Sequence, residues 1–203
     1  LYSTQDGAAD VLFTQIQGVF VMEQGENLGA IGAGKDVAWA DFDNDGNLDL
    51  FLARAGREDL LLLGNGEGRF AKAPLLIDGL DGASMAALAA DLDGDGGVDL
   101  MIPRDDAPAL LLHNSMSRGS WLQVDLEGAG TLREPVGALL TAHVGEQRYT
   151  RQVSARSGPS AVSRRVHFGL GAATTVDSLV VIWPGGARYA LTDVAVDQLL
   201  HLD

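Results

Sequence analysis

The sequence predicts an all-β protein in which repeated strand units precede a compact antiparallel β-sandwich-like domain. Three observations predict this class. Gly is abundant, with 26 among 203 residues, and aromatic residues make up only 6%. Apolar runs are short, and Gly, Asp or Pro interrupts them before a helical period can develop. An acidic nine-residue pattern occurs twice, which is typical of a repeat architecture.

The charge distribution divides the chain into two parts. The protein has 28 acidic and 14 basic residues, a formal net charge of −14. Residues 1–117 contain 20 acidic and 6 basic residues, whereas residues 118–203 contain 8 of each. We therefore predict one unit of acidic repeats over 1–117 and a separate β domain over 118–203. The acidity argues against nucleic-acid binding, and no apolar run reaches the ~18 residues that a membrane-spanning helix needs.

The first part contains an internal repeat. Residues 37–50 align without a gap with residues 87–100, at a spacing of 50 residues. Each unit is expected to contain a strand, an acidic loop, a strand, a turn and a strand, and to bury one face against a neighbour. A third, partial unit is expected at residues 1–7. The strands after the loops are expected at 48–53 and 98–102, followed by Leu-rich strands at 61–63 and 111–113.

The second part alternates between apolar and polar residues in short segments that Gly or Pro turns separate. Seven such segments in about 85 residues are typical of an antiparallel sandwich. The strands are expected at 121–126, 137–144, 147–153, 164–168, 178–183, 187–191 and 198–202.

The two acidic segments, 41–49 and 91–99, both read D-x-D-x-D-G-x-x-D. Ca²⁺ takes six to eight oxygen ligands in flexible geometry, and alternate carboxylates can converge on it when the chain curls around the ion. Gly at position 6 permits the turn, position 7 offers a backbone carbonyl, and Asp at position 9 closes the shell with both oxygens. Two Ca²⁺ ions are therefore predicted, held by Asp41, Asp43, Asp45, Asn47 and Asp49 and by Asp91, Asp93, Asp95, Gly97 and Asp99.

Other interpretations of these loops fit less well. Mg²⁺ prefers tight octahedral geometry and keeps its waters, and neither loop contains the His or Cys that Zn²⁺ favours. An EF-hand requires an acidic residue at position 12, where this chain has Leu52 and Ile102. A solvated acidic turn that binds nothing is the remaining alternative, and the recurrence at equivalent repeat positions argues against it.

The repeats resemble the FG-GAP/VCBS family, whose calcium-loop β-propeller units also occur in integrin α chains. Residues 118–203 resemble the ASPIC/UnbV domain that often follows such repeats in proteins similar to cartilage acidic protein. The matching segments of this second part are Ser120–Leu126, Val136–Ala138, Val166–Gly171, Val180–Gly186 and Leu191–Val194.

The resemblance implies partial β-propeller-like blades in the first part. A closed propeller of this kind has about seven blades, so two loops and a partial unit do not close one. The chain is then a piece of a longer repeat protein, or its blades form an open stack, or a partner completes them.

No catalytic constellation is present in the sequence, and we predict that the protein is not an enzyme. The four histidines show no metal-ligand spacing, and His167 is expected to make a local hydrogen bond. Basic residues on the predicted strands of the second part form a solvated face or a docking surface for an acidic partner. They are Arg148, Arg151, Arg156, Arg164 and Arg165.

The predicted function is non-enzymatic calcium binding in adhesion or protein–protein assembly, with calcium in a structural role. The expected location is secreted, cell-surface or periplasmic, and the expected partner is another protein or a second copy of the chain. Two alternatives stay open: a carbohydrate-binding accessory module with a glycan site in the sandwich, and a structural subunit of a surface filament or larger complex.

Overall fold

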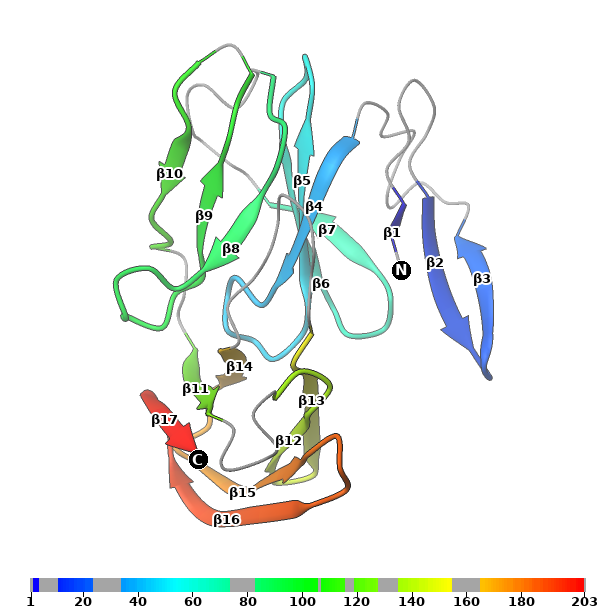
Figure 1. The fold of residues 1–203 in the computed structure, drawn as a ribbon. Coiled ribbons are helices and arrows are strands. Elements are labelled where there is room, and N and C mark those ends of the chain that lie inside the picture. Colours follow the sequence, from blue (N-terminus) through cyan, green and yellow to red (C-terminus); the bar gives the residue numbers. More distant parts are fainter. Residues whose placement is uncertain are drawn as a thin grey trace. The chain divides into compact units, whose positions relative to one another are not determined.

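The computed structural model describes residues 2–3, 11–23, 34–73, 83–105, 107–115, 119–127, 135–154 and 165–202. All the regular secondary structure in these ranges is β-strand, which confirms the predicted class. The chain forms two compact units (Figure 1). Unit 1 comprises residues 1–42, 47–89 and 99–113, and unit 2 comprises residues 43–46, 90–98 and 114–203. Within the described part of the chain, no helix could cross a membrane.

The described residues of unit 1 form three sheets. The first has the order β1-β2-β3, the second β4-β5-β6-β7, and the third β10-β9-β8. Their strands are β1 (Tyr2–Ser3), β2 (Val11–Ile16), β3 (Val19–Glu23), β4 (Gly34–Ala40), β5 (Asp49–Arg54), β6 (Leu60–Gly64), β7 (Phe70–Lys72), β8 (Leu88–Ala90), β9 (Asp99–Ile102) and β10 (Leu110–Leu112).

The repeat unit has the predicted order of elements. In the first repeat, an acidic loop joins β4 to β5 and a turn leads to β6; in the second, an acidic loop joins β8 to β9 and β10 follows. The first repeat also has a fourth strand, β7, which pairs with β6. Of the partial unit expected at residues 1–7, residues 2–3 form β1, and the remainder lies outside the described residues.

The core of unit 1 centres on β5, all of whose six residues are buried. Pairing with β4 on one side and β6 on the other satisfies the backbone of this strand. Trp39 and Phe70 pack edge to face at the border, with ring centroids 5.9 Å apart. The buried cluster consists of Leu12, Leu50, Leu52, Leu60 and Leu62.

A buried carboxylate connects the first repeat to the segment before the second. Asp59 accepts the backbone N–H of Arg54 and the hydroxyl of Ser84, both at 2.7 Å. Asp59 and Ser84 are almost fully buried, and burial raises the pKa of Asp59 above its ordinary value. The first repeat is therefore joined to the segment before the second by a polar contact.

Within the part of unit 2 that the structure describes there are two sheets, with the orders β14-β11-β17 and β13-β12-β15-β16. All seven predicted strands of the second part are present. They are β11 (Ser120–Leu126), β12 (Leu139–Val144), β13 (Gln147–Gln152), β14 (Val166–Gly171), β15 (Thr175–Ile182), β16 (Arg188–Ala195) and β17 (Gln198–Leu202).

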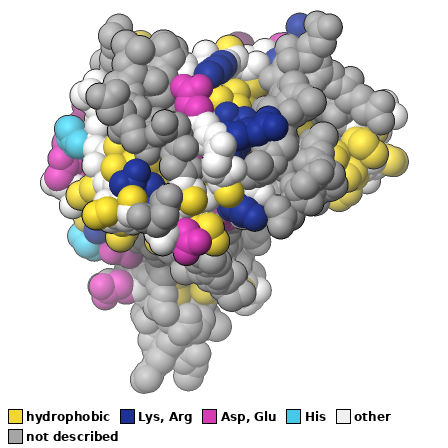
Figure 2. All heavy atoms as spheres, turned by 90° about the horizontal axis from the view of Figure 1, so that it is seen from above, with side chains coloured by type: hydrophobic (Ala, Val, Ile, Leu, Met, Phe, Trp, Pro, Cys, Tyr) yellow, Lys and Arg dark blue, Asp and Glu magenta, His cyan; other side chains and the backbone are white. Residues whose placement is uncertain are grey.

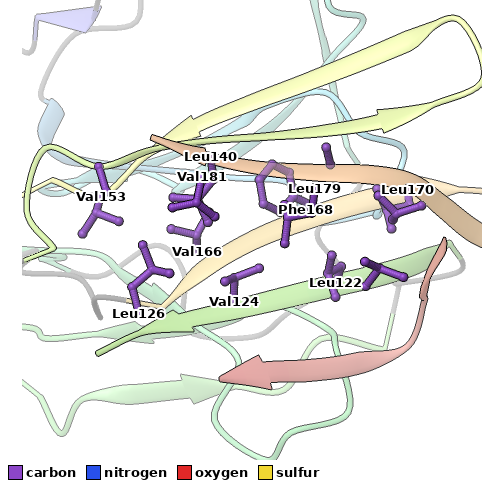
Figure 3. Packing of buried hydrophobic residues seen from close by; sticks show 14 residues of the cluster. Leu122, Val124, Leu126, Leu140, Val153, Val166, Phe168, Leu170, Leu179 and Val181 are labelled. Carbon is purple, nitrogen blue, oxygen red and sulfur yellow. The ribbon is translucent and has the colours of Figure 1, made fainter. Parts of the chain in front are cut away.

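The two sheets of unit 2 pack face to face over one apolar core, as a sandwich requires. Leu122, Val124 and Leu126 point inward from β11 at alternate positions, because successive strand side chains face opposite sides (Figure 3). Leu140, Leu179 and Val181 oppose them from the other sheet. The other described strand pairs of this unit are antiparallel, as predicted, but β11 and β17 pair in parallel.

Candidate metal centres

The first acidic loop, residues 41–48, begins directly after β4, and Ala40 and Asp49 face each other across its base. The second loop, residues 91–98, connects β8 to β9 in the same way. Each loop is therefore anchored by two paired strands at its ends. Only the residues between those strands are free to curl around an ion.

Both loops turn through the left-handed backbone region at the same two positions. At position 6, Gly46 has a φ of 97° and Gly96 a φ of 87°, as the turn proposed from the sequence requires. At position 4, Asn44 has a φ of 57° and Gly94 a φ of 81°. The sequence analysis missed this second turn point, although Asn and Gly are the residue types that adopt such angles most readily.

The structure brings together the carboxylates at positions 1, 3 and 5 of each loop. In each triplet, one ligand oxygen per residue lies within 4.8 Å of the others. The backbone N–H of position 5 donates to the position 3 carboxylate at 3.2 Å in both loops. The triplets are Asp41, Asp43 and Asp45, and Asp91, Asp93 and Asp95.

Position 9 lies at the buried base of each loop. Asp49 accepts the backbone N–H groups of Phe42, at 2.7 Å, and of Gly64, at 2.8 Å, one at each carboxylate oxygen. It does not belong to the triplet of its loop, and its hydrogen bonds connect the loop to β6. Asp99 is equally buried and lies 3.4 Å from Nδ1 of His113.

His113 is a neighbour that sequence reasoning missed. Its imidazole is exposed, and the 50-residue spacing places Leu63 at the equivalent position of the first repeat. The base of the second loop can therefore offer a nitrogen ligand or donor that the first lacks. The two loops are not chemically identical despite their common pattern.

The residues at position 7 differ in side chain, and the sequence predicts a ligand role only for their backbone carbonyls. Asn47 is half-buried and Gly97 is buried. The N–H of Gly97 donates to Asp95 at 2.7 Å, which holds the chain in a tight turn at this point. A ligand role for the carbonyl oxygens of Asn47 and Gly97 stays a prediction.

The electrostatics of the first loop favour a cation. Burial raises the pKa of Asp43, and the nearby charge of Asp45 raises it further, while backbone N–H groups act in the opposite direction. An ionised Asp43 is therefore held at a cost in free energy. A divalent cation between the carboxylates would remove that cost, so the residues present fit a hard metal ion.

Side chains from β11 and β14 contact the loops within unit 2. Gln123 donates from Nε2 to Asp91 at 2.7 Å. His167 lies 2.7 Å from Oδ1 of Asn44 through Nε2 and 3.4 Å from Nε2 of Gln123 through Nδ1. These partners require a neutral imidazole with its proton on Nε2.

Burial lowers the pKa of His167 to about 4, with Arg151 acting in the same direction and Asp91 opposing it, so the ring is neutral at pH 7. The sequence analysis expected a local hydrogen bond for His167, and this prediction was wrong. The bond joins residues 123 positions apart. Gln123 was missed altogether.

The fold and loops define an all-β repeat protein with paired acidic turns and a C-terminal sandwich. Comparison with protein families agrees: an FG-GAP-like repeat matches residues 41–102, and the ASPIC and UnbV family matches residues 128–203. The two matches therefore lie in the order that the sequence resemblance implied, an FG-GAP-like repeat followed by an ASPIC/UnbV match. A search of curated proteins finds no match to it.

Proposed function

We propose that this protein is a non-enzymatic calcium-binding protein that holds one Ca²⁺ in each acidic loop. The observation that carries the proposal is the duplicated triplet: three carboxylates converge within 4.8 Å in both repeats. Oxygen donors without a thiolate suit a hard cation, and a loop without preset octahedral geometry suits Ca²⁺ better than Mg²⁺.

The ions would have a structural role. Each loop lies between two paired strands of a repeat, so a bound ion fixes the connection on which the strand register depends. Extracellular calcium modules bind at about 10⁻⁴–10⁻³ M, and FG-GAP repeats are typical of extracellular proteins. We therefore place the protein outside the cytoplasm, as a secreted, surface or periplasmic component in adhesion or assembly.

The partner would be another protein or a second copy of the chain. On the face seen in Figure 2, the acidic side chains are scattered among basic and apolar ones. A mixed surface of this kind suits contact with a protein better than attraction to a strongly charged polymer.

Thermal unfolding in Ca²⁺ and in EGTA tests the proposal. We expect a higher melting temperature in Ca²⁺, because a ligand that binds only the folded state stabilises it by about 2.7 kcal/mol at 100 times its Kd. The double variant Asp45→Ala, Asp95→Ala should lose this shift. Asp105→Asn, at an exposed position outside both loops, serves as the control and should retain it. Equal melting temperatures for the wild type in the two buffers would overturn the proposal.

A further inference from the structure

Three loop residues that are not predicted ligands, Asn44, Gly46 and Gly96, contact the sandwich of unit 2. A Cβ atom at Gly46 would overlap the ring of Tyr149, and one at Gly96 would overlap the indole of Trp121. Both glycines therefore satisfy two requirements, a left-handed turn and the close approach of an aromatic ring. A loop that only bound an ion would need the first alone.

Hydrogen bonds of the loop backbone continue this contact. Arg151 donates from a guanidinium nitrogen to the carbonyl of Gly46 at 3.2 Å. The backbone N–H of Gly171 donates to the carbonyl of Asn44 at 2.8 Å. Asn44 in turn donates from its side chain to the carbonyl of Gly96 at 3.0 Å, so the tips of the two loops are joined to each other.

Gln123 is a buried residue of β11 that links the sandwich to the second loop. Its side chain is only 2% exposed. Its amide nitrogen donates to Asp91, and its carbonyl oxygen accepts from Arg165 at 3.3 Å. A buried amide with partners at both ends has one favourable orientation, and that orientation fixes the carboxylate it contacts.

Asp91 already accepts three hydrogen bonds. Oδ1 accepts the N–H of Gly94 at 2.7 Å, and Oδ2 accepts the N–H of Gly96 at 3.0 Å and the amide of Gln123 at 2.7 Å. A carboxylate has about four lone-pair sites. One site is left for a metal, so Asp91 can serve as a ligand through one oxygen only.

We infer that the sandwich of unit 2 is part of the metal centre: Gln123 acts as a positioning residue that aims Asp91 at the Ca²⁺ of the second loop. His167 and Arg165 hold Gln123 in that orientation. The inference rests on the proposed calcium binding. It adds that the affinity of a repeat loop depends on a side chain of the sandwich, outside the repeat.

Titration calorimetry of CaCl₂ into the full chain, freed of metal with EGTA, tests this inference. Gln123→Met keeps the buried volume and removes all three side-chain hydrogen bonds, those with Asp91, His167 and Arg165. The background variant Asp43→Ala disables the first loop, so the measured affinity belongs to the second. We expect Gln123→Met to weaken binding about 10-fold, the size typical of lost outer-shell contacts.

Gln152→Met is the matched control. Gln152 lies on β13, is exposed and donates to the backbone carbonyl of Gly137 at 3.4 Å, away from both loops. It should bind Ca²⁺ like the wild type. Melting temperatures in EGTA distinguish a positioning role from a purely structural one. If the role of Gln123 were purely structural, Gln123→Met would lower the melting temperature and leave the affinity for Ca²⁺ unchanged.

A second variant covers the case in which Gln123→Met does not fold. His167→Leu removes both ring nitrogens at similar volume and should also weaken binding at the second loop. Unchanged affinity in the folded variants, with the wild type binding Ca²⁺, would overturn the inference and leave the proposed function intact. A wild type that binds no Ca²⁺ would overturn both.

Discussion

At the scale of single residues, the same residue type performs different tasks at neighbouring positions. Gly94 and Gly96 both have positive φ angles, but nothing lies within 4 Å of a Cβ built at Gly94, whereas Trp121 fills that space at Gly96. The two positions therefore separate the cost of backbone strain from the cost of a steric overlap.

We predict that Gly94→Ala lowers the free energy of unfolding by about 1 kcal/mol, the cost of a left-handed L-residue. Gly46→Ala and Gly96→Ala should cost more than about 2 kcal/mol, because overpacking against Tyr149 and Trp121 adds to the strain. Urea unfolding of the three variants in EGTA measures these values. Equal costs at all three positions would mean that the rings do not pack on the loops.

His167 gives the protein a stability that depends on pH. Its pKa is lowered from 6.5 to about 4 in the folded chain. Between pH 6.5 and about pH 4, His167 is protonated in the unfolded chain and neutral in the folded chain. The contribution of neutral His167 to the free energy of unfolding is therefore complete above pH 6.5 and is lost as the pH falls towards 4.

We predict that the wild type loses up to about 3 kcal/mol more stability than His167→Gln between about pH 7 and pH 4. Glutamine keeps a hydrogen-bonding group but does not titrate, so the difference isolates the imidazole. Denaturant unfolding of both proteins across this range provides the measurement. Parallel stability curves would contradict the prediction.

At the scale of the element, the first acidic loop has a part that a metal would contact and a base that belongs to the sheet. Asp43 illustrates the first, with a raised pKa beside Asp45. Asp49 illustrates the second, since both its oxygens accept backbone N–H groups. Without a metal ion, ionised Asp43 therefore lowers the stability of the folded protein, whereas Asp49 raises it through its hydrogen bonds.

We predict that Asp49→Asn destabilises the protein in EGTA by about 1–3 kcal/mol, because an amide NH₂ replaces one acceptor and meets a donor. Asp43→Asn should leave the stability in EGTA unchanged or raise it, and should reduce stabilisation by Ca²⁺. Melting curves of both variants in the two buffers distinguish them. Similar losses in EGTA would contradict the assignment of separate roles.

The sequence was a good guide to these elements and a poor one to their contacts. The strands on either side of the loops and the turn at Gly46 and Gly96 follow from residue types within a few positions of each other. The contact of Asn44 with His167 depends on how segments 123 residues apart fold together, which no local pattern encodes. The hydrogen bonding of Asp49 within the sheet was hidden for the same reason, because its partner Gly64 is the last residue of β6, 15 positions further along the chain.

At the scale of the whole molecule, the net charge of −14 is carried by residues 1–117, where the eight loop aspartates are concentrated. Unneutralised carboxylates repel one another and oppose compaction. Two Ca²⁺ ions would add four positive charges where the repulsion is greatest.

We predict that raising NaCl from about 0.02 to about 0.5 M increases the melting temperature in EGTA, since shorter Debye lengths screen the carboxylates. In saturating Ca²⁺ the same change should have a much smaller effect. A matched series in KCl would exclude a specific effect of Na⁺. An equal dependence on salt in both buffers would show that the loop charges do not set the stability of the apo protein.

The parallel pair of β11 and β17 also has a consequence for biosynthesis. Leu122 of β11 is hydrogen-bonded in register with Gln198, so the strand that carries Gln123 gains its second neighbour only after residues 198–202 leave the ribosome. The hairpins of the repeats have close partners in sequence and can form earlier. The nascent chain would therefore expose acidic loops with weak affinity for calcium until the sandwich closes, which delays metal capture until residues 198–202 have been synthesised.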